Sequence, residues 1–510
     1  MRVTRRPVAV SCLVALLLAA CDEGSGVPDQ HQSLSSIPTT AVATTPSAPF
    51  IVPPLVWDPC GEAECATLTV PRDYEDPGAG TFHLAVARRR AERPDLRKGV
   101  LVFSPGGPGL PGTTGLVAGS DRFSVDLRAR FDIVSSDQRG VNEGAVVDCV
   151  DDPDYFRGLD PTPDTPGEAA RLARRAQEFI GGCVERSGDL LPYVSTTAAA
   201  RDVDLLRAAL GEEQISYLGV SYGAALGAVY ATLFPHRVRA MVLDGGYDPS
   251  ADAAVLTAQG AAARERVLRV ILRDCAADRL CYFHNSGDAA AAFKRLMALL
   301  DAAPMSVAPS LPAVDQEEAW RAVLFALPDE AMWTRLTMAL GEAQAGDAME
   351  LLLLSEESVS HGVPEADASV ATGCLDWAGR REPAATGGPV GALTGLGARL
   401  GTGAGAYLCE RWPVPPRPVP TVTGSGAGAI LVAAVTGDVV TAFESSRDLA
   451  ETLQAGSLLV VEGYRHGAYQ PGRRDRACAV ATIDWYLISL TVPADGSVCL
   501  PENGLPEPPG

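Results

Sequence analysis

The sequence carries little positive charge and almost no lysine. Lysine and arginine together number 42, only two of them lysines, against 63 aspartates and glutamates, so the formal net charge is −21 over 510 residues. Nucleic-acid binding needs a basic surface, and electrostatic binding to anionic lipid needs one too. The composition therefore argues against both kinds of partner, and an acidic balance of this kind is commonly only solubilising.

Long hydrophobic runs are missing as well. The apolar segment near the start, Val8–Leu18, is too short to span a bilayer. It follows three arginines within the first six residues and precedes small residues, which is the pattern of a secretory signal peptide. We therefore expect residues 1–20 to be a signal peptide and the protein to be exported.

The end of this segment, Leu18-Ala19-Ala20-Cys21, is similar to the lipobox of bacterial lipoproteins. Cleavage before Cys21 would leave a lipid-modified cysteine, and two or more acyl chains would anchor the protein stably at the outer face of the membrane. Residues 21–52 are rich in serine, threonine and proline, so we expect a flexible tether. In the alternative, Cys21 follows an ordinary signal peptide by chance and the protein is secreted.

Paired CxxC motifs and clustered histidines are absent, so the spacing of zinc ligands is missing and we expect no metal site. Of twelve cysteines, Cys12 lies in the signal peptide and Cys21 at the predicted lipid site, which leaves ten. An even number in an exported chain indicates disulfides. Sequence alone leaves the connectivity open, and the simplest pairing is sequential: Cys60–Cys65, Cys149–Cys183, Cys275–Cys281, Cys374–Cys409 and Cys478–Cys499.

Strand-like and helix-like segments alternate on both sides of a long helical stretch. Residues 53–248 and 416–510 contain short apolar runs such as KGVLVFS, EQISYLGV and AILVAAV, each followed by a helical pattern. Residues 249–415 are alanine-rich and helical in pattern, and PVPPRPVP marks their end. The pattern predicts one α/β domain, a mostly parallel sheet with helices on both faces, interrupted by a helical cap insertion.

Gly219-Val220-Ser221-Tyr222-Gly223 matches G-x-S-x-G between a predicted strand and a predicted helix. A sharp turn in that context exposes the serine hydroxyl above the sheet, and the two glycines leave room for neighbouring backbone. The alternative is an ordinary helix start where small residues cluster. We predict that Ser221 is a nucleophile.

Chain order then selects the other two catalytic residues, because in this fold the acid and the histidine each follow a late strand. Only His466 follows the last apolar strand, so we assign it as general base; the other histidines are His31, His83, His236, His284 and His361. Asp438 follows the strand before and would orient the imidazole. Glu444, in or near the next helix, and Glu462, within or at the end of the last strand, are the competitors.

The oxyanion hole needs two main-chain N–H groups. The amide of Tyr222, next after the nucleophile, supplies one. The second is expected from the glycine-rich loop Ser104–Gly109, where Pro108 has no N–H to donate and Gly107 is the best candidate.

Several motifs together resemble the prolyl-iminopeptidase and tripeptidyl-aminopeptidase branch of the α/β-hydrolases. They are GGPG, DQRG at 137–140, GVSYG, LDG at 243–245, D-x-x-T at 438–441 and the cysteine-bearing C-terminal region, Cys478–Cys499. The resemblance extends from about residue 53 onward and is strongest to exported actinobacterial members. It implies a serine exopeptidase that removes short peptides or single residues from free N-termini, with a helical cap, a C-terminal TAP-like region and no cofactor.

An aminopeptidase must also bind the protonated amine of its peptide substrate, which calls for a carboxylate. The resemblance implies Asp376, just after a cap cysteine, and Asp248 at the cap entry is a second candidate. This sequence departs from the family at Arg465, where glycine commonly precedes the histidine. A carboxylesterase or lipase using the same triad, and an inactive hydrolase fold serving as an envelope binding lipoprotein, are the alternative functions.

Overall fold

The computed structural model describes residues 50–119, 122–141, 146–152, 155–159, 163, 165–361, 366–376 and 408–501. The predicted signal peptide, Cys21 and nearly all of the predicted tether lie outside the described residues, as do residues 377–407 of the predicted cap. Among the described helices, none is both long enough and apolar enough to cross a bilayer.

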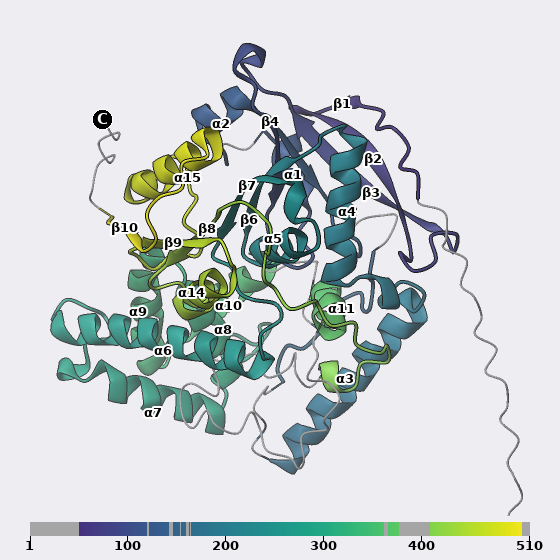
Figure 1. Cartoon of the computed structure of the whole chain (residues 1–510). Coiled ribbons are helices and arrows are strands. Elements are labelled where there is room, and N and C mark those ends of the chain that lie inside the picture. The colour runs from purple at the N-terminus through teal and green to yellow at the C-terminus, as the bar shows by residue number, and fades with distance from the viewer. Residues whose placement is uncertain are drawn as a thin grey trace, which may run out of the picture. The chain divides into compact units, whose positions relative to one another are not determined.

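A ten-stranded sheet in the order β1-β2-β3-β5-β4-β6-β7-β8-β9-β10 forms the centre of the fold (Figure 1). The first strands pair antiparallel, and every pairing from β5–β4 through to β9–β10 is parallel. This is the mostly parallel α/β-hydrolase sheet that the sequence predicts. The strands are β1 Asp58–Cys60, β2 Ala63–Pro71, β3 Thr81–Arg89, β4 Gly99–Ser104, β5 Phe131–Ser136, β6 Ile215–Val220, β7 Val238–Asp244, β8 Ile430–Val435, β9 Gly456–Val461 and β10 Ser497–Cys499.

Helices cover both faces of the sheet, because the central strands are apolar on both sides. In β4, Val100 and Val102 join one buried cluster, while Leu101 and Phe103 join the cluster on the opposite face. The first cluster includes α4 Thr196–Ala209, α5 Tyr222–Leu233 and α14 Phe443–Thr452. The second includes α1 Gly112–Val117, α2 Val125–Arg130 and α15 Ala477–Ser489.

The chain between β7 and β8 is helical and has its own buried core. That core is built by α6 Ala253–Ala277, α7 Ala289–Ala302, α8 Gln316–Ala326, α9 Glu330–Gln344 and α10 Met349–His361. A separate buried cluster joins α11, Ala366–Asp376, to α3, Pro166–Ser187, which precedes β6 in the chain (Figure 1). The helix α3, which lies before the predicted cap in the chain, therefore packs against α11 of the predicted cap.

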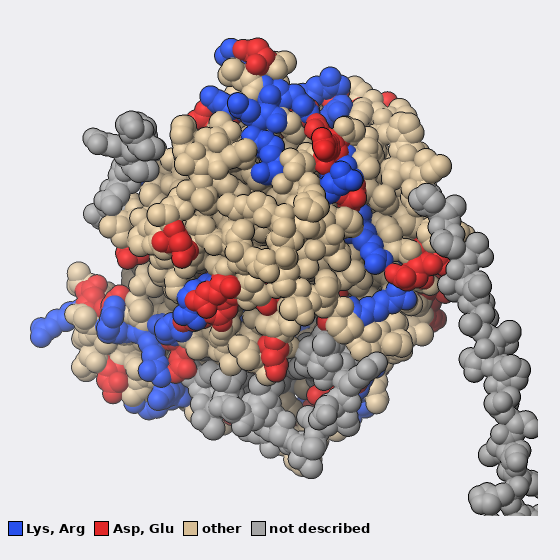
Figure 2. Space-filling view, in the orientation of Figure 1, with Lys and Arg blue, Asp and Glu red and all other residues tan. Residues whose placement is uncertain are grey.

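The ten cysteines outside the N-terminal segment form five disulfides in the sequential pairing: Cys60–Cys65, Cys149–Cys183, Cys275–Cys281, Cys374–Cys409 and Cys478–Cys499. Cys374–Cys409 ties α11 to the described chain beyond residue 407. On the face shown in Figure 2, acidic and basic side chains lie beside one another, so the excess negative charge forms no single acidic patch there.

Candidate active site

Ser221 lies in a strained turn between β6 and α5. Its backbone has φ 59° and ψ −125°, a left-handed conformation that residues other than glycine rarely adopt. The turn is closed by the amide of Ser221, which donates to the carbonyl of Asp244 at 2.8 Å. A Cβ on Gly223 would lie 2.3 Å from the Ser104 carbonyl oxygen, so only glycine fits at this close approach. The G-x-S-x-G turn thus has the geometry that its sequence predicts.

His466 and Asp438 meet at the carboxyl edge of the sheet, each in the loop after its strand. His466 Nδ1 lies 2.7 Å from Asp438 Oδ2, and the Asp438 side chain is only 1% exposed. The amides of Val440 and Thr441 donate to Asp438 Oδ1, which fixes the carboxylate. Burial opposes the charged imidazole, but Asp438 and, more distantly, the Asp244 carboxylate outweigh burial and raise the pKa of His466.

The two other candidates for the acid of the triad, Glu444 and Glu462, lie in different surroundings from Asp438. Glu444 is in the first turn of α14 and forms an ion pair with Arg266 at 2.9 Å. Glu462 is exposed at the end of β9. The geometry therefore favours Asp438 as the partner of His466.

Asp244, the last residue of β7, connects the serine turn to the histidine loop, and the sequence analysis gave it no role. Its fully buried carboxylate accepts the amides of Ala468 at 2.7 Å and Tyr469 at 2.8 Å, while its carbonyl accepts the amide of Ser221. The sequence signal that could have identified Asp244 is the LDG motif, which places an acid at the end of an apolar strand. Asp244 thus acts as a positioning residue for both loops.

Asp244→Asn tests this role. An asparagine keeps the shape but offers only one acceptor for two amides, so the histidine loop should shift and kcat should fall by about tenfold to 10²-fold. Because the Asp244 charge helps to raise the pKa of His466, the acidic limb of the kcat/KM profile should move to lower pH. Asp495→Asn is the matched control, because Asp495 accepts a single main-chain amide near the amino end of β9 and an asparagine oxygen can still accept it. An unchanged kcat and pH profile in Asp244→Asn would show that the histidine loop keeps its conformation without this carboxylate.

The glycine-rich loop after β4 lies directly against the serine turn. A Cβ built on Gly106 would come within 2.8 Å of the Val220 carbonyl oxygen and 3.0 Å of Ser221 Cβ. It would also lie 3.6 Å from the amide nitrogen of Tyr222. The loop that carries Gly107 therefore lies close to the amide of Tyr222, as an oxyanion hole built from these two amides would require.

Asp376 and Asp248, the predicted amine-binding acids, lie in different settings. Asp376 ends α11 and accepts the amide of Thr196 at 3.0 Å and its hydroxyl; that hydroxyl lies 2.7 Å from the hydroxyl of Tyr222. Burial raises the pKa of Asp376 to about 7, against the opposing effect of the two hydrogen bonds from Thr196. Asp248 uses Oδ1 to accept the amide and hydroxyl of Ser250. Asp376 is therefore the acid that the structure links to the residue beside the nucleophile.

The histidine loop also contacts the cap. Arg465, immediately before His466, forms an ion pair with Asp329, the N-cap residue of α9. One turn further along that helix, the ring of Trp333 packs edge-on against Tyr464 with centroids 4.9 Å apart. The family departure at Arg465 thus corresponds to a direct connection between the catalytic loop and the cap.

A strained serine after a central parallel strand, with a histidine–aspartate pair after the last two long strands, defines a serine hydrolase of the α/β-hydrolase class. Among the described residues, no group of three histidine, cysteine or acidic side chains is placed to hold a metal ion. Two family models match the chain: the alpha/beta hydrolase fold over residues 99–286 and the TAP-like protein over residues 400–499.

Relatives with curated names place the chain in a narrower family. Serine protease Hip1 of Mycobacterium tuberculosis is 32% identical over 495 residues, covering 88% of this chain and 92% of that protein. The tripeptidyl aminopeptidase of Streptomyces lividans is 40% identical over 205 residues, 38% of this chain and 37% of that protein. Carboxylesterase B of M. tuberculosis is 31% identical over 489 residues, 90% and 92% of the two chains. The chain belongs to the TAP-like α/β-hydrolase serine peptidases.

Proposed function

We propose that the protein is an exported serine exopeptidase that removes short peptides or single residues from free N-termini. Two observations carry the proposal together: the 2.7 Å contact of His466 with the buried Asp438, and the strained backbone of Ser221 in the G-x-S-x-G turn. Five disulfides are typical of an exported protein, which supports export; anchoring through Cys21 is part of the proposal.

In the proposed reaction, Ser221 Oγ attacks the scissile carbonyl carbon and gives its proton to His466 Nε2, because Nδ1 faces Asp438. The amides of Gly107 and Tyr222 donate to the oxyanion of the tetrahedral intermediate. The imidazolium then protonates the leaving amine, and an acyl-enzyme remains. Water, deprotonated by His466, releases the N-terminal fragment and restores the serine.

The Asp376 carboxylate is proposed to bind the substrate's ammonium group. Its charge acts on the hydroxyls of both Tyr222 and Tyr247, and Tyr247 lines a cavity with Thr441 beside the histidine–aspartate pair. A buried carboxylate in this position could pair with an ammonium group that the substrate brings. Asp248 is the second candidate for the same role.

Carboxylesterase activity is the alternative, because a relative named carboxylesterase matches over nearly the whole chain. The two functions differ in their need for a free amine. We would compare one peptide with a free N-terminus and the same peptide acetylated, and analyse the products by mass spectrometry. Release of a short N-terminal fragment from the free peptide only is the expected result. Failure to cleave either peptide, with p-nitrophenyl esters still hydrolysed, would identify an esterase.

Amine binding by Asp376 predicts a particular pH dependence of KM. The carboxyl group ionises above its pKa of about 7, and a peptide amine keeps its proton below roughly pH 8. The KM for a free peptide should therefore rise as pH falls through 7, whereas the KM for an uncharged p-nitrophenyl ester should not.

Asp376→Asn should remove this dependence and raise the KM for the free peptide about tenfold or more, since a charge-assisted hydrogen bond is lost. Asp248→Asn is the matched comparison. If Asp248→Asn alone raised the KM, the amine would be bound at the cap entry; if neither variant changed it, amine recognition would lie elsewhere.

A further inference from the structure

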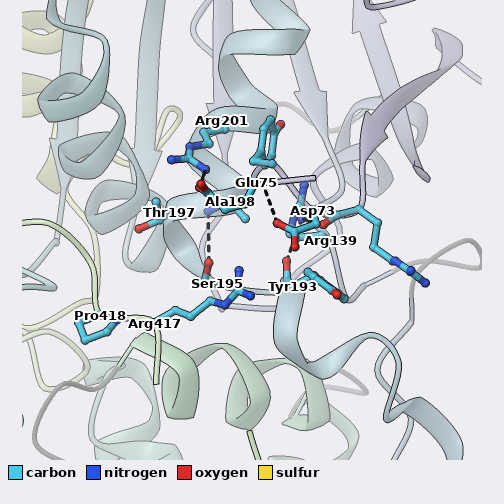
Figure 3. Close-up of a pocket in the computed structure, with 12 residues that line it drawn as sticks. Asp73, Glu75, Arg139, Tyr193, Ser195, Thr197, Ala198, Arg201, Arg417 and Pro418 are labelled. Atoms are coloured by element: carbon cyan, nitrogen blue, oxygen red, sulfur yellow. Dashed lines mark hydrogen bonds and ion pairs between the residues drawn. The ribbon is translucent and has the colours of Figure 1, made fainter. Parts of the chain in front are cut away.

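A cavity of about 210 Å³ lies at the start of α4, where the turn after β2 meets the chain that returns from the cap. Four arginines and two acids line it, so cations predominate locally in a protein of net charge −21. Figure 3 shows that the lining residues come from segments far apart in the sequence. The triad plays no part in this cavity, because Ser221, Asp438 and His466 do not line it.

Two of the four arginines that line the cavity already form ion pairs with carboxylates. Arg139, from the DQRG motif, is buried and paired with Asp202 at 2.6 Å, and it also donates to the carbonyls of Arg72 and Tyr193. Arg201 pairs with Glu75 at 3.1 Å. Arg139 therefore holds two walls of the cavity in place without leaving an unpaired charge there.

The other two arginines, Arg72 and Arg417, have no carboxylate partner within the described part of the chain. Both guanidinium groups lie near the ring of Tyr193, at 5.4 Å and 5.6 Å from its centroid. Figure 3 shows Arg417 extending from its own segment toward Tyr193 and Ser195. Two arginines from segments far apart in the chain thus contribute positive charge to one cavity.

Two of the residues that line the cavity also carry a buried donor atom without a partner. Arg72 Nε and Thr197 Oγ1 are both inaccessible to solvent and without a hydrogen-bond partner. Buried polar groups are nearly always paired, and one left unpaired is costly. The Asp73 carboxylate also lines the cavity and would repel an anionic ligand. One of its oxygens already accepts the amide of Glu75. A ligand that brings acceptor oxygens to the cavity would neutralise the two guanidinium groups that lack a carboxylate partner.

We propose that this cavity binds an oxyanion, either inorganic phosphate or the free carboxylate of a peptide, between Arg72 and Arg417. Guanidinium groups pair with planar or tetrahedral oxyanions through forked N–H groups. The cavity volume admits a group of this size. The proposal does not rest on the peptidase function, because the binding groups are separate from the triad.

The test is titration calorimetry on the full chain carrying Ser221→Ala, at constant ionic strength in chloride. The probes are sodium phosphate and one N-acetylated peptide with either a free carboxylate or a C-terminal amide. Saturable one-to-one binding of phosphate identifies free phosphate as the source. Binding of the free-carboxylate peptide, but not of its amide, identifies a peptide carboxylate. Absence of saturable binding by both oxyanions would overturn the proposal.

Arginine variants locate the site. Arg72→Gln and Arg417→Gln should each weaken binding about tenfold or more, whereas Arg266→Gln, which removes an arginine paired with Glu444, should leave it unchanged. Arg417 is exposed, so its replacement should not disturb folding, and this variant decides the test if Arg72→Gln fails to fold. Unaltered binding in Arg417→Gln would place the oxyanion elsewhere.

Discussion

Ser221→Ala is expected to lower kcat by about 10⁴-fold or more while the fold remains intact. The hydroxyl is the only group of this turn that can form the acyl-enzyme, and its removal also leaves His466 without a proton to accept. The residual rate would come from the oxyanion donors and substrate binding alone. Steady-state kinetics with the free peptide and with a p-nitrophenyl ester should show the same loss, since both reactions would use one nucleophile.

Two measurements separate a lost nucleophile from a damaged protein. A fluorophosphonate probe should label the wild-type chain at Ser221 and leave the variant unlabelled. Ser425→Ala, at an exposed position remote from the turn, should keep full activity and labelling. Full turnover by Ser221→Ala would refute the triad. Loss of turnover together with a lowered melting temperature would call for Ser221→Cys, whose thiol keeps a nucleophile at the same atom.

The site residues that the sequence predicts are those marked by a short local motif or by their order along the chain. Ser221 was predictable because G-x-S-x-G fixes a strand–turn–helix conformation, and the structure has that conformation with a positive φ. His466 and Asp438 were predictable because parallel strands end at one edge, so chain order translates into spatial order. Their contact follows from β8 and β9 being neighbours in the sheet.

The parts that sequence did not predict depend on contacts between distant segments. Arg465 meets Asp329 across 136 positions, and no local pattern marks that pair. Asp244 reads as an ordinary strand end until the histidine loop folds over it and donates two amides to its carboxylate. The packing of α3 with α11 likewise depends on residues that are far apart in the chain and share only apolar character.

Asp438→Asn is expected to lower kcat by about 10⁴-fold, close to the effect of removing the nucleophile. Asp438 Oδ2 now accepts the Nδ1 proton of His466, which leaves Nε2 free to take the serine proton. An asparagine amide can donate to Nδ1 and stabilise the opposite tautomer, in which Nε2 already carries a proton. The carboxylate also raises the pKa of His466, so its loss should move the acidic limb of the remaining activity to lower pH.

Glu444→Gln is the matched control, because it neutralises the competing acid in α14 and breaks only a partly exposed ion pair with Arg266. This variant should keep kcat within about twofold, as expected for the loss of an exposed pair. The reverse result, a large loss in Glu444→Gln and near-normal turnover in Asp438→Asn, would transfer the role to Glu444. The buried Asp438 makes that outcome physically unfavourable, since its carboxylate already accepts three amides, the Thr441 hydroxyl and the imidazole. An acid held this firmly orients the imidazole before substrate arrives, which is the property that its role in the triad requires.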